Sequence, residues 1–201
     1  MAPPRSARRV RQAPSNRPIT HGAHYLADWA VRRILDTLPP HSGELVVDLG
    51  AGLGALTVPL ARQGATVIAV EQHPATAAAL RRRVASLDVT VVERDLRDFR
   101  WPSGPFRIVA NPPFGLSVWL LHELTQHRPA ALRDASLLLQ RGFVRQLTNP
   151  PIDGRTARWQ QAAEFTELLQ LPATAFTPAP RVGASLLHLV PRRRSQHHRG
   201  G

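Results

Sequence analysis

Four short apolar segments, each carrying or followed by a polar side chain, constrain the fold of this chain more than any other feature. They are Leu45–Leu49, Thr66–Val70, Val89–Val92 and Phe106–Ala110. Their length and their many β-branched residues are typical of buried strands, and the stretches between them are long enough for helices. The pattern predicts an α/β fold in which a mostly parallel sheet has helices on both faces.

The rest of the chain continues this alternation and predicts a sheet of seven strands. Strands are expected at residues 44–49, 66–71, 89–93, 106–110, 135–140, 164–171 and 184–190, and helices at 28–38, 55–63, 75–87, 117–127 and 142–148. The last two strands are close in sequence, so we expect them to be antiparallel. Asp28 is expected to cap the first helix, and residues 148–155 are expected to form a loop.

Acidic residues stand at the ends of three successive strands. Asp48 ends the first, Glu71 ends the second and Asp95 follows the third. Ligands of open α/β sheets bind outside the carboxyl ends of the strands, and a ribose-binding carboxylate usually comes about 20 residues after the first turn, as Glu71 does. Asp95 could accept from an adenine amino group, with Leu96 as an apolar wall. Each acid by itself also fits a solvated surface position.

A glycine-rich turn, Gly50–Gly54, joins the first strand to a helix. Glycines allow the backbone to approach a ligand closely. Their spacing is G-x-G-x-G, whereas dinucleotide-binding enzymes prefer G-x-G-x-x-G. Because Asp48 lies just before the turn, a cationic aminoacyl group suits this loop better than a pyrophosphate. A plain strand-to-helix turn is the alternative.

The run Asn111-Pro112-Pro113-Phe114 closes the fourth strand. Two prolines cannot continue a sheet ladder, so the chain must turn there. The turn presents the Asn111 side-chain carbonyl, a main-chain carbonyl such as that of Pro112, and the Phe114 ring. The lone pair of a planar amino group is delocalised into the ring of the base, and hydrogen-bond acceptors on its N–H bonds free that lone pair for reaction. Stacking of the base on an aromatic ring contributes about 1–3 kcal/mol. An ordinary proline-rich turn is the alternative.

Together these motifs resemble the Rossmann-like S-adenosylmethionine methyltransferases, and more narrowly the ribosomal RNA adenine N6-methyltransferases of the Erm and KsgA type. Ser136–Leu147 is similar to the fifth strand and the following helix of that family, and Phe176–Leu189 is similar to the segment that leads into its last strand. His24–Asp28 stands where the family has an amide-rich motif. The resemblance covers roughly residues 17–192.

Several positions depart from the family pattern. Ala23 and His24 replace the amides, Gly142 replaces an acidic residue, and Pro112 stands where many members have an aliphatic residue. Asn-Pro-Pro-Phe motifs are also found in DNA adenine and protein glutamine methyltransferases. The chain ends soon after its last expected strand, so most of the small helical domain that usually follows is expected to be missing.

The resemblance implies a site for S-adenosylmethionine and no metal. The expected cofactor-binding residues are His24, Leu26, Asp48, Gly50, Gly52, Glu71, Gln72, Asp95, Leu96 and Asn111. The resemblance assigns the catalytic role to Asn111, Pro112 and Phe114. The first two would accept from the target amino group and the third would stack on the base, during direct transfer of the methyl group. Arg141 and Arg145 are expected to contact RNA phosphates.

The positive charge of the chain is concentrated at its two ends. The formal net charge is +12, and every residue of the Lys and Arg class is arginine. Five arginines precede residue 18 and four follow Pro191, without an acid among them. We therefore expect basic, disordered tails at 1–17 and 192–201 around a catalytic domain at 18–191. Guanidinium groups bind phosphate, so the tails are expected to contact RNA through Arg8, Arg9, Arg192, Arg193 and Arg194. Solubilising tails and codon bias are the alternative.

Composition excludes several classes of protein. The chain has no cysteine, which rules out disulfides and thiolate metal sites and fits the cytoplasm. No apolar run approaches the roughly 20 residues that span a bilayer, and no signal peptide is evident. The pairs His21/His24 and His197/His198 are too sparse for a metal site. A monomer is expected.

The expected activity is methyl transfer to N6 of an adenine in 23S ribosomal RNA, which in the Erm branch confers macrolide resistance. The short, arginine-only chain favours that branch. A small-subunit ribosomal RNA adenine, a DNA adenine or a protein glutamine are alternative targets. A non-catalytic RNA-binding protein with the same fold is the alternative of another class.

Overall fold

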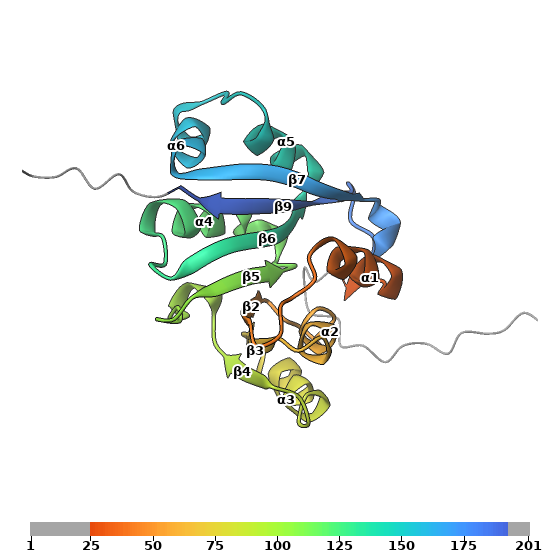
Figure 1. Ribbon diagram of the computed structural model, residues 1–201. Coiled ribbons are helices and arrows are strands. Elements are labelled where there is room, and N and C mark those ends of the chain that lie inside the picture. Colours follow the sequence, from red (N-terminus) through yellow and green to blue (C-terminus); the bar gives the residue numbers. More distant parts are fainter. Residues whose placement is uncertain (1–24, 193–201) are drawn as a thin grey trace, which may run out of the picture.

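The computed structural model describes residues 25–192, which form a seven-stranded sheet between two layers of helices (Figure 1). The strands are β2 (Leu45–Leu49), β3 (Thr66–Glu71), β4 (Val89–Glu93), β5 (Phe106–Ala110), β6 (Leu132–Gln140), β7 (Ala163–Leu171) and β9 (Ala184–Pro191). Their order is β4-β3-β2-β5-β6-β9-β7. The first five are parallel neighbours and β9 runs antiparallel to both β6 and β7. The predicted fold class is confirmed.

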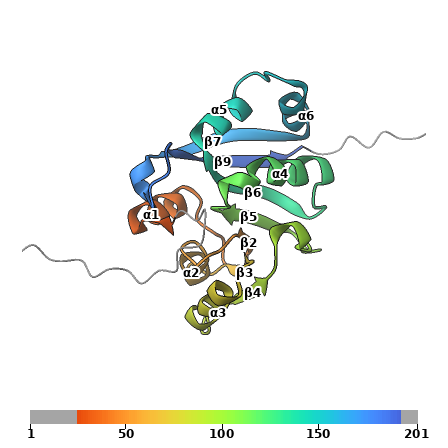
Figure 2. The ribbon, with the colours of Figure 1, turned by 180° about the vertical axis from the view of Figure 1, so that it is seen from behind.

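Two helical layers cover the two faces of the sheet. The helices are α1 (Asp28–Thr37), α2 (Thr57–Arg62), α3 (Pro74–Arg83), α4 (Ser117–His122), α5 (Arg141–Thr148) and α6 (Gly154–Ala162). Because side chains alternate along a strand, Val46 packs with α1 and α2 while its neighbour Val47 packs with α4, α5 and α6. Figures 1 and 2 show α1–α3 on one side of the sheet and α4 and α6 on the other.

Short elements complete the fold. A two-stranded antiparallel sheet pairs β1 (Tyr25–Leu26) with β8 (Phe176–Thr177). The 3-10 turns are η1 (Leu96–Asp98), η2 (Phe114–Leu116) and η4 (Ala173–Ala175), and η3 (Glu123–His127) is a π-helix that continues α4. Within residues 25–192, every helix is too short or too polar to cross a lipid bilayer.

The structure corrects several of the expected features. Asp28 lies in the first turn of α1, and the N-cap is Ala27, so Asp28 does not cap the helix. The helix expected at 75–87 ends at Arg83, and β6 begins at Leu132 because its first residues pair beside β5. Residues 154 and 155 belong to α6, since the Asp153 carboxylate caps that helix by accepting from the Thr156 N–H at 2.7 Å.

The helix expected at 117–127 is also interrupted. The α-helical hydrogen-bond pattern ends at His122, and the next turn is the π-helix η3.

A buried ion-pair network ties the amino ends of the central strands together. Arg107 on β5 is 7% exposed and donates to Glu44 at 3.2 Å and to Asp134 at 3.3 Å. The two acids precede β2 and lie within β6, so one guanidinium joins three neighbouring strands. A buried charge is tolerated only when it is paired and hydrogen-bonded, as Arg107 is.

Replacing this guanidinium is expected to destabilise the fold. Arg107→Met leaves two carboxylates without their partner and should lower the free energy of unfolding by about 3–5 kcal/mol. The matched control is Arg81→Met, which removes the exposed pair of Arg81 with Glu93 at 2.9 Å and should cost at most about 1 kcal/mol. Urea unfolding of both variants measures the difference, and equal losses would contradict the network's role.

Candidate functional site

A cavity of about 590 Å³ lies at the carboxyl ends of the parallel strands. Nine of the ten predicted cofactor-binding residues line it: Leu26, Asp48, Gly50, Gly52, Glu71, Gln72, Asp95, Leu96 and Asn111. Pro112 and Phe114, the other two predicted catalytic residues, line it as well. The tenth, His24, lies outside the described residues. Residues as far apart in the chain as Leu26 and Phe114 therefore meet in one cavity.

The glycine turn packs directly against the Asn111–Phe114 turn. Gly50 has a positive φ of 73°, and a Cβ at this position would lie 3.2 Å from the Cδ of Pro113. A side chain there would be strained and would press on the proline. The two turns thus form adjoining walls of the cavity, and Gly50 allows their close approach.

The N–H groups of the glycine turn are already bonded within the protein. Gly50 and Ala51 donate to the Val70 carbonyl at 2.9 and 3.0 Å, and Gly52 donates to Glu71 Oε2 at 2.9 Å. Phosphate-binding loops leave such donors free for the anion. This turn is therefore shaped for close approach of a ligand, and its bonded donors make it less suited to a pyrophosphate than a phosphate-binding loop is.

Asp48 is the most deeply buried acid of the cavity wall. It is 2% exposed and accepts a hydrogen bond from the Thr57 hydroxyl at 2.6 Å. Burial raises the pKa of Asp48 from 3.8 to about 7, against the hydrogen bonds from Thr57, which lower it; the charge of Glu71 adds a smaller upward contribution. A cation beside this carboxyl would favour its ionised form.

Glu71 shapes the site from the end of β3. Its Oε2 atom accepts from the Gly52 N–H and its Oε1 atom accepts from the His73 N–H at 2.8 Å. Each carboxylate oxygen has a second lone pair, so Glu71 can hold the glycine turn and still accept from a ligand.

Asp95 has a partner that the sequence reasoning missed. Its two oxygens accept from the Arg97 side chain at 3.0 and 2.6 Å, and Oδ1 also accepts from the Arg97 N–H at 2.9 Å. The hydrogen bonds from Arg97 lower the pKa of Asp95 to about 2. The sequence does contain a signal of this contact, which is the spacing of two positions between Asp95 and Arg97. An acid that caps a short turn faces the residue two positions later.

The Phe114 ring is oriented by the small sheet. It packs edge to face on Phe176 of β8, with ring centroids 6.4 Å apart and an interplanar angle of 70°. The turn is closed by two bonds: the Leu116 N–H donates to the Pro113 carbonyl at 2.9 Å, and the Ser117 hydroxyl donates to the Phe114 carbonyl at 2.8 Å. The aromatic contact positions the ring, and the two hydrogen bonds fix the turn that carries it.

Among the described residues, the predicted RNA-binding arginines Arg141, Arg145 and Arg192 do not line the cavity. Arg141 is partly buried and donates to the Leu171 carbonyl at 3.1 Å, whereas Arg145 is exposed on α5. Arg192 is exposed, and its N–H donates to the Ala162 carbonyl at 2.9 Å. Arg8, Arg9, Arg193 and Arg194 lie outside the described residues.

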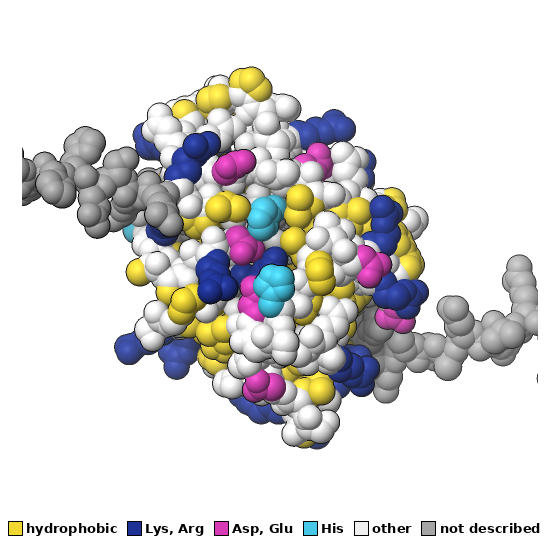
Figure 3. Space-filling view, in the orientation of Figure 1, with side chains coloured by type: hydrophobic (Ala, Val, Ile, Leu, Met, Phe, Trp, Pro, Cys, Tyr) yellow, Lys and Arg dark blue, Asp and Glu magenta, His cyan; other side chains and the backbone are white. Residues whose placement is uncertain are grey.

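Other basic residues do line the cavity, and the sequence reasoning missed them. They are Arg32, Arg62, His73, Arg83 and Arg97. Arg83 also donates to the Leu53 carbonyl of the glycine turn at 2.8 Å. On the face shown in Figure 3, arginine side chains are mixed with acidic ones rather than gathered in one patch.

The fold and the cavity together define a class, the Rossmann-like α/β methyltransferases. A solved structure with this fold is that of the 23S rRNA methyltransferase ErmE. It superimposes on this chain with a TM-score of 0.75 and 24% sequence identity, over 85% of this chain and 70% of that one.

Sequence comparison narrows the class to a family. The sequence model of the family described as ribosomal RNA adenine dimethylase matches residues 15–199. The Ribosomal RNA small subunit methyltransferase A of Aromatoleum aromaticum is 32% identical over 177 residues, which are 85% of this chain and 66% of that protein. An rRNA adenine N-6-methyltransferase of Corynebacterium diphtheriae is 34% identical over 169 residues, 83% and 66% of the two chains.

The chain therefore belongs to the ribosomal RNA adenine dimethylase family, and the resemblance seen in the sequence is confirmed. It spans about two thirds of the length of these two relatives.

The raised pKa of Asp48 predicts a pH-dependent stability. In the unfolded chain this carboxyl titrates near 3.8, whereas in the folded protein it titrates near 7. Between these pH values Asp48 is protonated in the folded state and ionised in the unfolded state. Asp48 therefore contributes a stabilisation that is fully present below pH 4 and is lost as the pH rises through about 7. Relative to Asp48→Asn, the free energy of unfolding should fall by at most about 1.4 kcal/mol per pH unit. Urea unfolding at pH 4.5, 6 and 8 measures it, and a constant difference would contradict the raised pKa.

Proposed function

We propose that this protein transfers a methyl group from S-adenosylmethionine to N6 of an adenine in ribosomal RNA. The observation that carries the proposal is the close packing of Gly50 on Pro113, with 3.2 Å between a Cβ at Gly50 and the proline Cδ. A methyl group passes directly between its donor and acceptor only if their sites share a wall. Here the glycine turn, which forms one wall of the cavity, is in contact with the Asn111–Phe114 turn, which would hold the base.

The residues of the cavity fit S-adenosylmethionine. A volume of about 590 Å³ lies within the roughly 300–1,000 Å³ of small-molecule sites. Asp48 would face the cationic aminoacyl group, Glu71 would accept from the ribose hydroxyls, and Asp95 with Leu96 would hold the adenine. Gly50 and Gly52 would let the ligand approach the backbone. When bound, the cofactor supplies a methyl group on a positively charged sulfur.

The remaining predicted cofactor residues would complete this site. Leu26, Gln72 and Asn111 line the same cavity, and His24 is assigned to the site from the sequence alone. Arg97, which already binds both oxygens of Asp95, would fix the orientation of that carboxylate toward the adenine.

Catalysis would rest on positioning of the target base. The Asn111 side-chain carbonyl and the Pro112 main-chain carbonyl would accept from the adenine amino group, and Phe114 would stack on the ring. Holding two reactants in the productive geometry can contribute about 7–11 kcal/mol in favourable systems. The adenine has to leave its base stack to reach this turn.

Two ribosomal RNAs are candidate substrates. We propose an adenine of 23S RNA, with macrolide resistance as the consequence, as expected from the sequence. The name of the Aromatoleum aromaticum relative supports a small-subunit adenine as the second candidate. Membership of a ribosomal RNA adenine dimethylase family favours either RNA over a DNA adenine or a protein glutamine. Such a protein would act where ribosomes are assembled, in the cytoplasm.

Methylation of purified ribosomal RNA tests the proposal. Incubation of each RNA with the full-length protein and cofactor should produce N6-methylated adenosine, detected by mass spectrometry of nucleosides, and the RNA that gains the label identifies the substrate. Asn111→Ala should lose most of the single-turnover rate and keep its calorimetric affinity for the cofactor. Gly52→Arg should lose that affinity because it places a large side chain at a cavity-lining position with φ of 56°.

Two outcomes would count against this mechanism. An Asn111→Ala rate within a few-fold of the unaltered protein would reduce Asn111 to a turn former. Methylation of neither RNA by a protein that binds the cofactor would remove the proposed substrate class.

The basic segments at the two ends are proposed to hold the RNA around a catalytic domain at 18–191. Removing residues 1–16 and 193–201 deletes seven arginines: Arg5, Arg8, Arg9, Arg11, Arg193, Arg194 and Arg199. RNA affinity of the intact chain should fall with salt at a slope of roughly −0.7 to −0.9 per phosphate contact, and the trimmed protein should bind more weakly with a flatter slope.

Cofactor affinity serves as the control in this comparison, because the trimmed protein keeps every described residue that lines the cavity. If the two salt slopes coincide, the RNA surface lies on the body of the protein, and Arg145→Ala then becomes the informative variant.

A further inference from the structure

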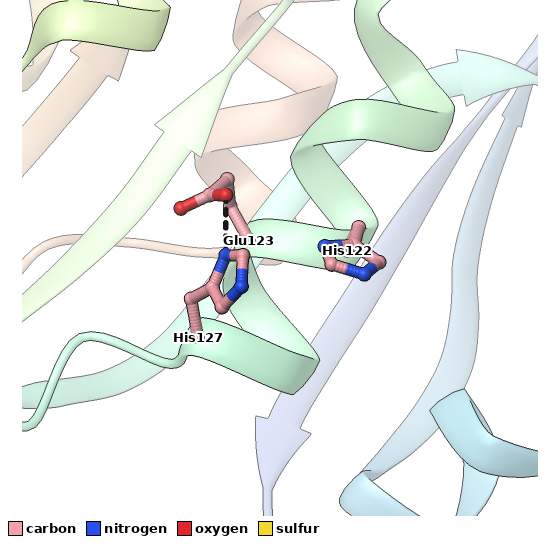
Figure 4. Close-up of side chains that lie close together, drawn as sticks. All are labelled: His122, Glu123 and His127. Carbon is pink, nitrogen blue, oxygen red and sulfur yellow. Dashed lines mark hydrogen bonds and ion pairs between the residues drawn. The ribbon is translucent and has the colours of Figure 1, made fainter.

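Three metal-ligating side chains meet at the end of α4, outside the set of residues that lines the cavity. His122 is the last residue of α4, and Glu123 and His127 are the first and last residues of η3. Each offers a ligand atom, and these three atoms lie within 4.8 Å of one another. Figure 4 shows the two imidazoles side by side, with the Glu123 carboxylate over His127. None of the three residues lines the cofactor cavity.

The contacts between the three side chains are well defined. The Nδ1 atom of His127 lies 2.7 Å from Glu123 Oε1. The imidazole rings of His122 and His127 are 4.9 Å apart at their centroids, with an interplanar angle of 76°. His127 is largely exposed, with 64% of its side chain accessible, and Glu123 is 21% accessible. A dissolved ion can therefore reach all three from solvent.

The π-helix is what brings the two histidines together. Residues five apart point in different directions on an α-helix, which has 3.6 residues per turn. On a π-helix, where the hydrogen bonds join residues five apart, they lie one turn apart on the same face. The Arg128 N–H donates to the Glu123 carbonyl at 2.7 Å, which is a bond of this kind. Single π turns inside helices are frequent at functional sites.

The residue that ends the π-helix has an unfavourable backbone conformation. Arg128, which ends the π-helix, has a φ of 29°, the one positive value found for a non-glycine residue among residues 25–192. A residue with a Cβ rarely adopts this region, and such strain persists only where the surroundings impose it. The Arg128 guanidinium donates to the carbonyl of Arg192 at the end of β9, which fixes the residue from the other side.

The donor set selects the kind of ion. Two imidazole nitrogens and one carboxylate suit zinc and neighbouring divalent transition metals, whereas magnesium and calcium prefer oxygen ligands alone. Three protein ligands leave at least one coordination position for water. Binding would replace the present contact of His127 with Glu123 by bonds from both side chains to the ion.

We propose that His122, Glu123 and His127 form a surface site for a divalent transition metal, separate from the cofactor cavity. Its place in the fold follows from the strand directions. β5 ends at the cavity, whereas η3 leads into Leu132 at the start of β6, which pairs with Phe106 at the start of β5. The metal site thus lies toward the edge of the sheet where β5 and β6 begin, opposite to the edge that carries the cavity. A bound ion would stabilise the connection between α4 and β6.

Zinc binding to the full-length protein tests the site. After treatment with a chelator, calorimetric titration with Zn²⁺ alone should show one tight site per chain, and the melting temperature should rise with zinc concentration. His127→Gln and His122→Gln should each lower zinc affinity by at least about tenfold. Without metal, both variants should melt close to the unaltered protein, because both side chains are exposed.

A matched control separates this site from other histidines of the chain. The double variant His197→Gln/His198→Gln removes the only adjacent histidine pair and should keep the affinity of the unaltered protein. Co²⁺ provides a second readout, since its visible absorption should show a site of four or five ligands that disappears in His127→Gln. Zinc affinity that is lost in the tail variant, or kept in both His127→Gln and His122→Gln, would overturn the proposal.

Discussion

Parallel hydrogen bonding of β3, β2 and β5 is the constraint on which the site depends. β2 lies between the other two, with Val47 paired to Ile68 on one side and to Ile108 on the other. Because parallel strands end at the same edge, this register brings Asp48, Glu71 and Asn111 to one cavity although they are separated by 63 residues. Displacing one of these strands in the sheet order would remove its polar residue from the cavity.

The acids Asp48 and Glu71 line the cavity and also accept hydrogen bonds from neighbouring protein groups. Glu71 accepts from the backbone of the glycine turn and from His73, so the residue proposed to hold the ribose also determines the shape of the loop beside it. Asp48 is held by Thr57 at the start of α2 and has its pKa raised by burial. The protein's own contacts therefore organise the site: its glycine donors are bonded to protein acceptors, and a positive charge beside Asp48, its most buried acid, would favour the ionised carboxylate.

The two edges of the sheet differ in chemistry. The carboxyl edge carries the cavity, whose walls come from loops and glycine turns. The amino edge carries the buried Arg107 network, which joins β5 to Glu44 and to Asp134 on β6. The π-helix also ends near this second edge, and it leads into β6. This arrangement separates the groups that hold the strands together from the groups that would bind the cofactor. The effect of a substitution on stability at one edge is therefore distinct from the effect on ligand binding at the other.

The sequence by itself determined the order of the elements and the polar residues at the strand ends. β3, β4 and β5 have the predicted boundaries at 66–71, 89–93 and 106–110, because short β-branched runs between turn residues are a local signal. It did not reveal α6, which starts at Gly154 directly after a stretch that contains asparagine, two prolines and aspartate. Nor did it reveal the π-helix, which differs from an α-helix by one residue in its hydrogen-bond spacing. Only the tertiary structure decided that Arg141 bonds to the Leu171 carbonyl, that Phe114 rests on Phe176, and that His122 meets His127. The first two contacts depend on strand order and on the packing between layers, which join residues far apart in the chain. The third depends on the π-helical hydrogen bonding of residues 123–127, which no local sequence pattern predicted.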